Sequence, residues 1–260
     1  LDHIKDRPLT LKRYPDGIDS DGFFQKKKSD YFPEWISSKN LKRKVGNKIN
    51  MVTLNKKAGL VYLANQACIV LHPWLSKADK PAFPDKIIFD LDPPGDDFGQ
   101  VKDAAKKLRE ILTEELDLPV YLMSTGSSGL HVAVPIRRNM KFDEVKDFSR
   151  KVATLMADRY PEKYTVEIRK DKRKDRIFID FLRNEYAQTS VAPYSLRAVK
   201  NAPVAAPLSW DELDDFKGPQ SISLQNIFKR MGQKKDPWSD FRKDAKSLKT
   251  PATKLAKLKK

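Results

Sequence analysis

The segment from Lys86 to Pro94 (KIIFDLDPP) constrains the fold more than any other stretch. Residues 87–89 are β-branched or aromatic, which predicts a buried strand. Asp90 and Asp92 follow, and side chains two apart on a strand share one face, with Cβ atoms about 7 Å apart. Carboxylates that close repel each other unless a cation lies between them. Because proline cannot donate to a sheet, Pro93 ends the strand and leaves both acids at its end.

A third acid stands in a similar setting. Asp180 interrupts the apolar run Ile177–Leu182, and a buried aspartate is costly unless it is paired or ligates a metal. We therefore expect Asp90, Asp92 and Asp180 to converge on the same divalent ions, Mg²⁺ or Mn²⁺, which take oxygen ligands. The alternative for the Asp-x-Asp pair alone is a solvated, aspartate-rich turn.

The charge of the chain indicates a polyanionic partner. The 260 residues include 51 Lys and Arg against 35 Asp and Glu, a formal net charge of +16, so nucleic acid is the first expectation. The 40% hydrophobic content is enough for a sizeable core. No apolar run approaches a membrane span, and no signal peptide opens the chain. The single Cys68 fits a reducing cytoplasm, and no zinc-ligand spacing is present.

Helical spacing of apolar residues predicts helices over residues 101–112 and 142–159. Between them, the turn Ser124–Gly129 is rich in hydroxyls and glycine, and such turns can hold phosphate oxygens, although a plain hairpin turn is the simpler alternative. His131 lies on the following strand, off its main apolar face, where it could contact an anion. The loop Thr189–Arg197 also carries hydroxyls and an arginine.

Basic segments and aromatic residues supply candidate nucleic-acid contacts. Phe23 and Phe24 adjoin a lysine run, and we expect one ring to face outward, where a base could stack; the alternative is that both are core. Residues 39–48 form a predicted mobile basic loop. Residues 165–169 and 176–181 form a predicted hairpin with a basic tip. Residues 241–260 are expected to fray as a basic C-terminal tail, after a domain spanning residues 1–240.

Several blocks together resemble one family. FDLDP at residues 89–93, SSGLHV at 127–132 and FID at 178–180 are similar to the three motifs of the archaeo-eukaryotic primase superfamily. The flanking blocks LKRYPDG (11–17), FFQK (23–26), ANQA (64–67) and VAPYSLR (191–197) resemble the polymerase domain of the prokaryotic non-homologous end-joining ligase D. The likeness extends from about Arg7 to Met231.

The resemblance implies an α/β fold with mixed or antiparallel sheets flanked by helices and a primase-like, RRM-like catalytic core. It implies a nucleotidyltransferase that extends primers and fills gaps during end-joining repair, prefers ribonucleotides and uses two Mn²⁺ or Mg²⁺ ions. It implies double-stranded DNA ends, gapped DNA and NTP or dNTP as binding partners, with Ku and a DNA ligase as further partners, in the prokaryotic cytoplasm at the nucleoid. Alternatives are a replicative primase subunit and a non-catalytic nucleic-acid-binding domain.

The resemblance also assigns residues. Asp90, Asp92 and Asp180 match the catalytic metal ligands. The positions implied for nucleotide binding are Lys12, His72, Thr125, Ser127, Ser128, Gly129, His131, Arg183 and Arg197. The positions implied for DNA binding are Phe23, Phe24, Lys26, Lys42, Arg43, Lys44, Lys172, Arg173 and Lys174. The chain departs from the family pattern at Ser128, where relatives often have lysine, and at Arg183, where they often have glutamine.

Overall fold

The computed structural model describes residues 1–95 and 97–258. Its strands group into a six-stranded sheet with the order β11-β7-β8-β6-β10-β9, a three-stranded sheet with the order β2-β1-β5, and the two-stranded hairpin β3-β4. The strands are β1 (Leu9–Arg13), β2 (Phe23–Gln25), β3 (Ser38–Leu41), β4 (Ile49–Val52), β5 (Cys68–Pro73), β6 (Lys86–Asp92), β7 (Tyr121–Ser124), β8 (Leu130–Pro135), β9 (Tyr164–Thr165), β10 (Ile177–Asp180) and β11 (Pro207–Leu208).

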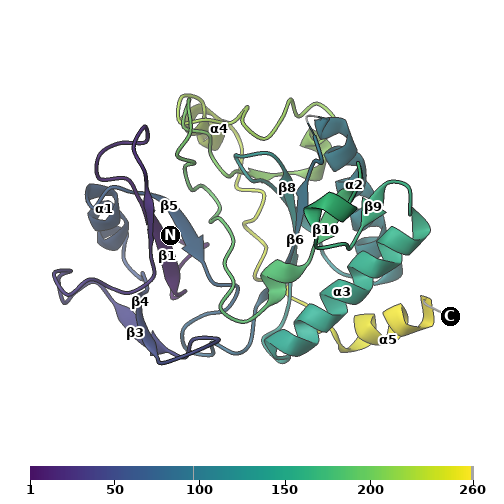
Figure 1. Ribbon diagram of the computed structural model, residues 1–260, viewed down its shortest axis with the longest axis horizontal. Helices are drawn as coiled ribbons and strands as arrows, with labels where there is room; N and C mark the ends of the chain where they lie inside the picture. Colours follow the sequence, from purple (N-terminus) through teal and green to yellow (C-terminus); the bar gives the residue numbers. More distant parts are fainter. Residues whose placement is uncertain (96, 259–260) are drawn as a thin grey trace.

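The helices are α1 (Lys57–Asn65), α2 (Phe98–Glu110), α3 (Phe142–Arg159), α4 (Ile227–Gln233) and α5 (Lys249–Leu258). A π-helical turn over Ile111–Glu115 continues α2. Helices α2 and α3 lie beside the six-stranded sheet, while α1, β1, β3, β4 and β5 form the other lobe (Figure 1). Mixed sheets with flanking helices confirm the expected α/β class.

The two faces of β6 have different neighbours. Ile87, Phe89 and Leu91 belong to the main core with the apolar residues of α2 and α3. Ile88 belongs to a second core with Val70 of β5. Because side chains alternate along a strand, Lys86, Asp90 and Asp92 share the face of Ile88, away from the helices. Two acids of the candidate site and one lysine thus lie toward the smaller lobe.

The predicted hairpin over residues 165–181 is wrong. Strand β9 pairs with β10 in parallel, with Tyr164 opposite Ile177. The segment between them folds on itself, because Arg173 donates to the carbonyl groups of Glu167 and Ile168 at 3.0 and 2.7 Å. The chain therefore leaves β9 through a compact basic loop and enters β10 in the same direction.

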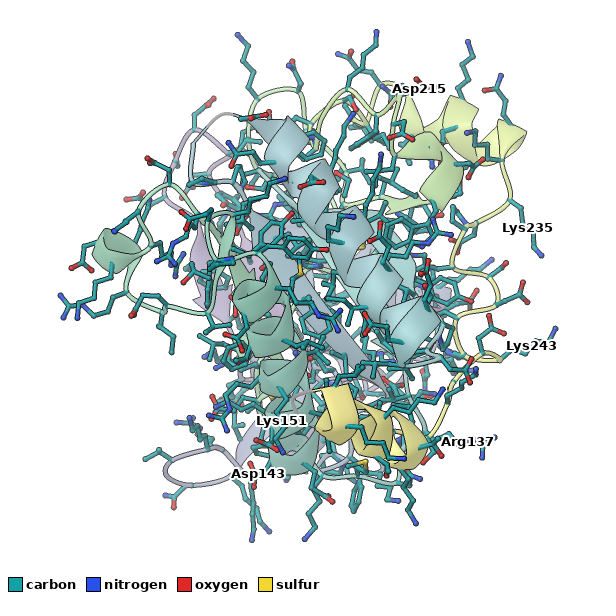
Figure 2. The ribbon with its side chains drawn as sticks, turned by 90° about the vertical axis from the view of Figure 1, so that its right-hand side faces the viewer. Arg137, Asp143, Lys151, Asp215, Lys235 and Lys243 are labelled. Atoms are coloured by element: carbon teal, nitrogen blue, oxygen red, sulfur yellow. The ribbon has the colours of Figure 1, made fainter. Side chains whose placement is uncertain are left out.

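Two further expectations are corrected. Residues 39–48 are not wholly a loop, because Lys39 lies in β3, opposite Met51 of β4, and only residues 42–48 connect the strands. The expected frayed tail contains α5, which has Leu255 buried and contacts α3. Figure 2 shows α5 lying across the end of α3 near Lys151, while Lys235 and Lys243 extend outward. Among the described residues, none of the helices has the length and apolarity to cross a bilayer.

Candidate active site

A row of polar side chains crosses the middle of the six-stranded sheet. Asp90 of β6 lies opposite His131 of β8 on one side and opposite Asp180 of β10 on the other. Directly opposed residues on neighbouring strands share one face, with Cα atoms about 4.5–5.5 Å apart. The register therefore brings together Asp90 and Asp180. Their strands are far apart in the sequence, because 84 residues, including helices α2 and α3, lie between Asp92 and Ile177.

Asp90 is buried and paired on both sides. One carboxylate oxygen lies 3.4 Å from His131 Nε2, and the other accepts from Arg183 Nε at 3.2 Å. Burial raises the pKa of Asp90, but His131 and Arg183 outweigh it and hold that pKa below its ordinary value. Asp90 is therefore an anion at neutral pH.

Asp92 and Asp180 are less well compensated. Burial raises the pKa of Asp92, and the charge of Asp90 raises it further, against a 2.7 Å hydrogen bond from Ser128 Oγ. The pKa of Asp180 is also raised, first by burial and then by Asp90, against the Leu182 N–H that donates to its carboxylate at 2.7 Å. Asp92 and Asp180 therefore lack the cationic partners that keep Asp90 ionised.

This donor set fits divalent ions in charge and in ligand type, since Mg²⁺ and Mn²⁺ prefer carboxylate oxygens. As the side chains stand, no three His, Cys, Asp or Glu groups within residues 1–95 and 97–258 are close enough to hold one ion. Arg183 occupies the neighbourhood instead, 3.2 Å from Asp90 and 4.0 Å from Asp180. A cation is therefore present among the carboxylates, and the protein itself supplies it.

Asp90 and Asp92 open into a small cleft of about 150 Å³ between the two lobes, whereas Asp180 is not among its lining residues. The cleft combines acids, cations and hydroxyls, as expected of a site for a charged polar ligand. Its lining residues are His72, Asp90, Asp92, Thr125, Ser127, Ser128, His131, Arg183, Thr189, Ser190, Val191 and Arg197. Seven of the nine positions implied for nucleotide binding are among them; Lys12 and Gly129 are not.

The turn between β7 and β8 forms the hydroxyl side of the cleft. Thr125 Oγ1 donates to the Gly129 carbonyl at 3.0 Å and accepts from the Ser127 and Gly129 N–H groups at 3.3 and 3.2 Å. Gly126 has a φ of +66°, which favours glycine. Gly129 packs so closely that an added Cβ would lie 2.0 Å from the Leu91 carbonyl oxygen and 2.7 Å from the Asp92 carboxylate. Only glycine therefore allows the turn to lie against the acidic strand.

The smaller lobe contributes His72 and, nearby, Lys12. Burial lowers the pKa of His72 to about 4, assisted by the positive charges of Arg197, Arg183 and Lys12. At neutral pH this imidazole is uncharged, so it can both donate and accept a hydrogen bond. Lys12 Nζ lies 5.3 Å from the centre of the Phe24 ring, and that ring lies 5.9 Å from the His72 ring.

Both aromatic residues of β2 face solvent, whereas the sequence led us to expect only one outward ring. Phe23 is 46% exposed and Phe24 is 59% exposed, and neither belongs to a core cluster. Lys26 is exposed beside them. Because both rings are exposed and lie beside cations, the core interpretation does not hold, and base stacking stays a prediction for this pair.

The other basic candidates lie on loops. Lys42, Arg43 and Lys44 are exposed in the β3–β4 connection, where Lys44 pairs with Glu185 at 2.8 Å. Lys172 and Lys174 are exposed in the β9–β10 loop. Arg173 differs, because its guanidinium lies 4.1 Å from the centre of the Phe178 ring and donates to two carbonyl groups. We therefore interpret Arg173 as organising the loop.

Thr189 and Ser190 line the cleft but were not singled out from the sequence. The hydroxyl-rich loop that contains them was noted, yet only Arg197 was assigned a role. No local sequence signal marks them, because a bridge between Thr189 and Trp74, which follows β5 directly, holds this loop against the strand of His72 only in the folded chain.

A mixed sheet with three acids on β6 and β10, a hydroxyl turn and clustered cations is the arrangement expected of one class: nucleotidyltransferases with a primase-like polymerase fold. The particular family follows from comparison. Residues 1–238 match the family described as LigD, primase-polymerase domain, and the chain belongs to that family.

Individual relatives agree. The chain is 33% identical over 216 residues to the multifunctional non-homologous end joining protein LigD of Mycolicibacterium smegmatis, covering 82% of this chain and 28% of the relative. It is 31% identical over 244 residues to the LigD protein of Pseudomonas aeruginosa, covering 93% of this chain and 29% of the relative. Thus it spans less than a third of the length of these two relatives.

A solved structure has the same fold. The polymerase domain from Mycobacterium tuberculosis ligase D, in complex with DNA, superposes with a TM-score of 0.86 and 28% identity. The match covers 94% of this chain and 87% of that chain. Membership of a primase-polymerase family implies that the chain is an enzyme of the nucleotidyltransferase class.

Proposed function

We propose that this chain adds nucleotides, preferably ribonucleotides, to a primer 3′-hydroxyl at DNA ends and gaps during non-homologous end joining. The observation that carries the proposal is the register of Asp90 opposite Asp180, beside a cleft with Arg197 and His131. The proposal places the activity in the prokaryotic cytoplasm at the nucleoid, with Ku and a DNA ligase as partners. The relatives' names and the DNA in the related structure support it.

Asp90, Asp92 and Asp180 would hold two Mn²⁺ or Mg²⁺ ions, which when bound lower the pKa of the 3′-hydroxyl and neutralise the pyrophosphate. The residues of the chain would position the nucleotide. Arg197 in the cleft supplies fixed positive charge and planar donors for phosphate oxygens. Lys12, next to the cleft, adds a further cation for the triphosphate. Little covalent work remains for the protein beyond positioning.

Sugar selection would depend on uncharged groups. His72, neutral because of its low pKa, and the hydroxyl of Ser127 can each bond a 2′-hydroxyl, whereas Thr125 Oγ1 already makes three hydrogen bonds within the turn and would position Ser127. A site that bonds a hydroxyl penalises the analogue that lacks it. One neutral hydrogen bond contributes about 0.5–1.5 kcal/mol, so the preference for ribonucleotides should be roughly tenfold at most.

The proposed test is single-nucleotide insertion on gapped DNA with Mn²⁺, comparing ribonucleotides with deoxyribonucleotides. Wild type should favour ribonucleotides, and the ratio should fall in His72→Phe or Ser127→Ala. Absence of extension with either Mn²⁺ or Mg²⁺ would contradict the polymerase assignment. Synthesis on single-stranded template without a primer would favour a replicative-type primase. Retained DNA binding without any synthesis would favour a non-catalytic binding domain.

A further inference from the structure

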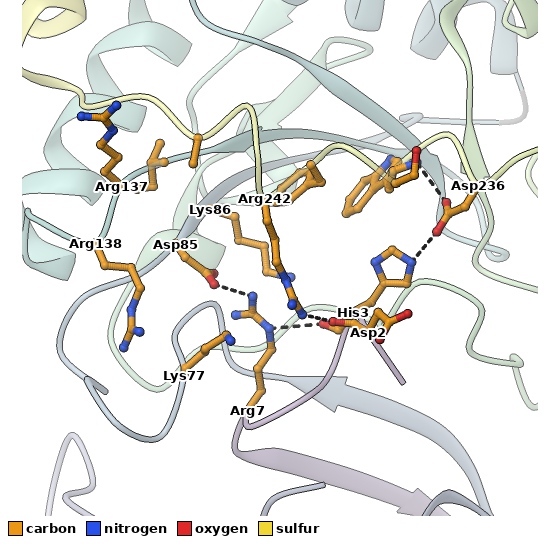
Figure 3. A pocket seen from close by; sticks show the side chains of 15 residues that line it. Asp2, His3, Arg7, Lys77, Asp85, Lys86, Arg137, Arg138, Asp236 and Arg242 are labelled. Atoms are coloured by element: carbon orange, nitrogen blue, oxygen red, sulfur yellow. Dashed lines mark hydrogen bonds and ion pairs between the residues drawn. The ribbon is translucent and has the colours of Figure 1, made fainter. Parts of the chain in front are cut away.

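A second cavity, of about 700 Å³, lies at the opposite end of β6 from the carboxylates. Four segments distant in sequence meet there: the stretch before β1, the segment that leads into β6, the residues that follow β8, and the loop between α4 and α5. Figure 3 shows Arg7, Lys86 and Arg242, each from a different segment, pointing into the cavity and toward one another. The site described above uses none of these residues.

The cavity carries more positive charge than its acids neutralise. Asp85 pairs with Arg7 at 2.6 Å, and Asp236 pairs with His3 at 2.8 Å. Four other lining cations make no ion pair with any carboxylate in the part of the chain that the structure describes. They are Lys77, Lys86, Arg137 and Arg242. Arg242 donates to the Asp2 carbonyl.

Lys86 is the decisive group. The residue is 3% exposed, its side chain lines the cavity, and it donates no hydrogen bond within residues 1–95 and 97–258, although Nζ is not among the fully enclosed atoms. A largely desolvated ammonium without an acceptor is costly, and an anion in the cavity would compensate it. Burial and the charge of Arg7, partly opposed by Asp85, lower the pKa of Lys86 to about 7.

Two further polar atoms in the cavity wall lack partners among the described residues: Asp85 Oδ1, an acceptor, and Arg138 Nε, a donor. The wall also includes Trp238 and Phe241, whose rings stack at 4.7 Å and 11°. The cavity thus offers cations for an anionic group, an acceptor for a hydroxyl, and an aromatic surface. Its volume is in the range of small-molecule sites.

We propose that this cavity binds a small organic phosphate, with the phosphate held by Lys86 and Arg242 and a hydroxyl donating to Asp85. Lysine and arginine suit phosphate because both give charge-assisted hydrogen bonds to its oxygens. A carboxylate ligand would engage fewer of the converging cations. The proposal stands apart from the polymerase assignment, because the two sites share no lining residue.

The test uses adenosine 5′-monophosphate as the probe, measured by isothermal titration calorimetry in EDTA on the 260-residue chain. The Arg197→Gln background removes a phosphate ligand of the carboxylate cleft, and AMP should still bind. Adding Lys86→Met should weaken binding at least tenfold, whereas Lys235→Met, an equal charge change at an exposed site (Figure 2), should not. Equal affinity in the Lys86→Met and Lys235→Met variants would overturn the proposal.

Two controls address folding and mechanism. If Lys86→Met fails to give a native circular dichroism melt, Arg242→Gln at the exposed rim should show the same loss of affinity. At pH 8, binding should also take up a proton, because a bound phosphate favours the charged ammonium of Lys86. The charged or titratable groups facing it are Arg7, Asp85 and Arg242, with Lys77 and His3 on the same wall. The same enthalpy in buffers of different ionisation enthalpy would contradict this.

Discussion

The two ends of β6 carry opposite buried charges on the same face of one strand. At one end Asp90 and Asp92 face a cleft in which His131 and Arg183 pair with Asp90, and at the other Lys86 faces a cavity with too few anions. Lys86 and Asp92 are six residue steps apart on an extended strand, which places their Cα atoms about 20 Å apart. The difference between the two ends is in compensation: Asp90 has two partners within 3.4 Å, whereas Lys86 has none among the described residues.

The comparison teaches that burial alone does not identify a functional charge. Asp90 keeps a pKa below its ordinary value because His131 and Arg183 offset burial, while Lys86 shifts toward its neutral form. A buried charge that is paired with other side chains of the protein stays ionised at neutral pH. A buried charge without such partners indicates that a bound ligand completes the site.

The largest effect should come from the acidic end. Asp90→Asn removes the negative charge between His131 and Asp180 and keeps the shape of the side chain. Primer extension should therefore fall by about 10²–10³ or more, as it does when an enzyme loses a preorganised polar group. DNA binding measured by fluorescence anisotropy should remain. Lys86→Met is the matched change at the other end and should leave extension near wild type. Near wild-type extension by Asp90→Asn would remove the basis of the catalytic assignment.

The next effect concerns stability at the basic end. The unfolded state binds a proton at Lys86 up to about pH 10.4, whereas the folded state releases it near pH 7. Because the unfolded state binds more protons between these values, wild-type stability should rise with pH there, by on the order of 3 kcal/mol. Urea titrations from pH 7 to 10 should show this rise in wild type, and Lys86→Met should lack it. A parallel rise in both proteins would contradict the buried, uncompensated lysine.

The sequence was sufficient for the acidic end because its signals are local. Acids at alternate positions of an apolar strand and a glycine-rich hydroxyl turn can be identified within a few residues, whereas the antiparallel register of β10 against β6 was not predicted, because tertiary pairing sets it. The basic end could not be predicted, since Arg7 and Arg242 meet Lys86 only through tertiary packing. Helix α5 was missed although Leu248, Ala252 and Leu255 keep helical spacing, because the high lysine content was given more weight.

An intermediate effect is expected at β2, whose Phe24 ring lies 5.9 Å from the His72 ring of the acidic end. Phe24→Ala should weaken binding of a template strand by about 1–3 kcal/mol if a base stacks on the ring. Because Phe24 is 59% exposed, its loss should leave the thermal midpoint nearly unchanged. Val61→Ala on α1, also exposed, is the control and should not affect binding. A fall in thermal stability without loss of binding would mean that the ring acts as core.

The smallest effect tests the built-in compensation of the acidic end. Arg183 lies 3.2 Å from Asp90 and 4.0 Å from Asp180, and its side chain is 42% exposed, so the guanidinium competes with a divalent ion for the same oxygens. A partly exposed ion pair contributes only about 0–1 kcal/mol, so Arg183→Gln should raise Mn²⁺ affinity by no more than roughly fivefold.

Electron paramagnetic resonance of free Mn²⁺ measures that affinity without turnover. A change in metal binding can therefore be distinguished from a change in catalysis. Arg176→Gln is the matched control, because Arg176 donates to backbone carbonyl groups and forms no ion pair with a described carboxylate. Its Mn²⁺ affinity should equal that of wild type. Weaker Mn²⁺ binding in Arg183→Gln would mean that Arg183 orients Asp90 for the ion instead of competing with it. The acidic end would then need Arg183 to complete its metal site, just as Lys86 is proposed to need a bound phosphate. In that case the two ends of β6 would no longer differ in how their charges are compensated.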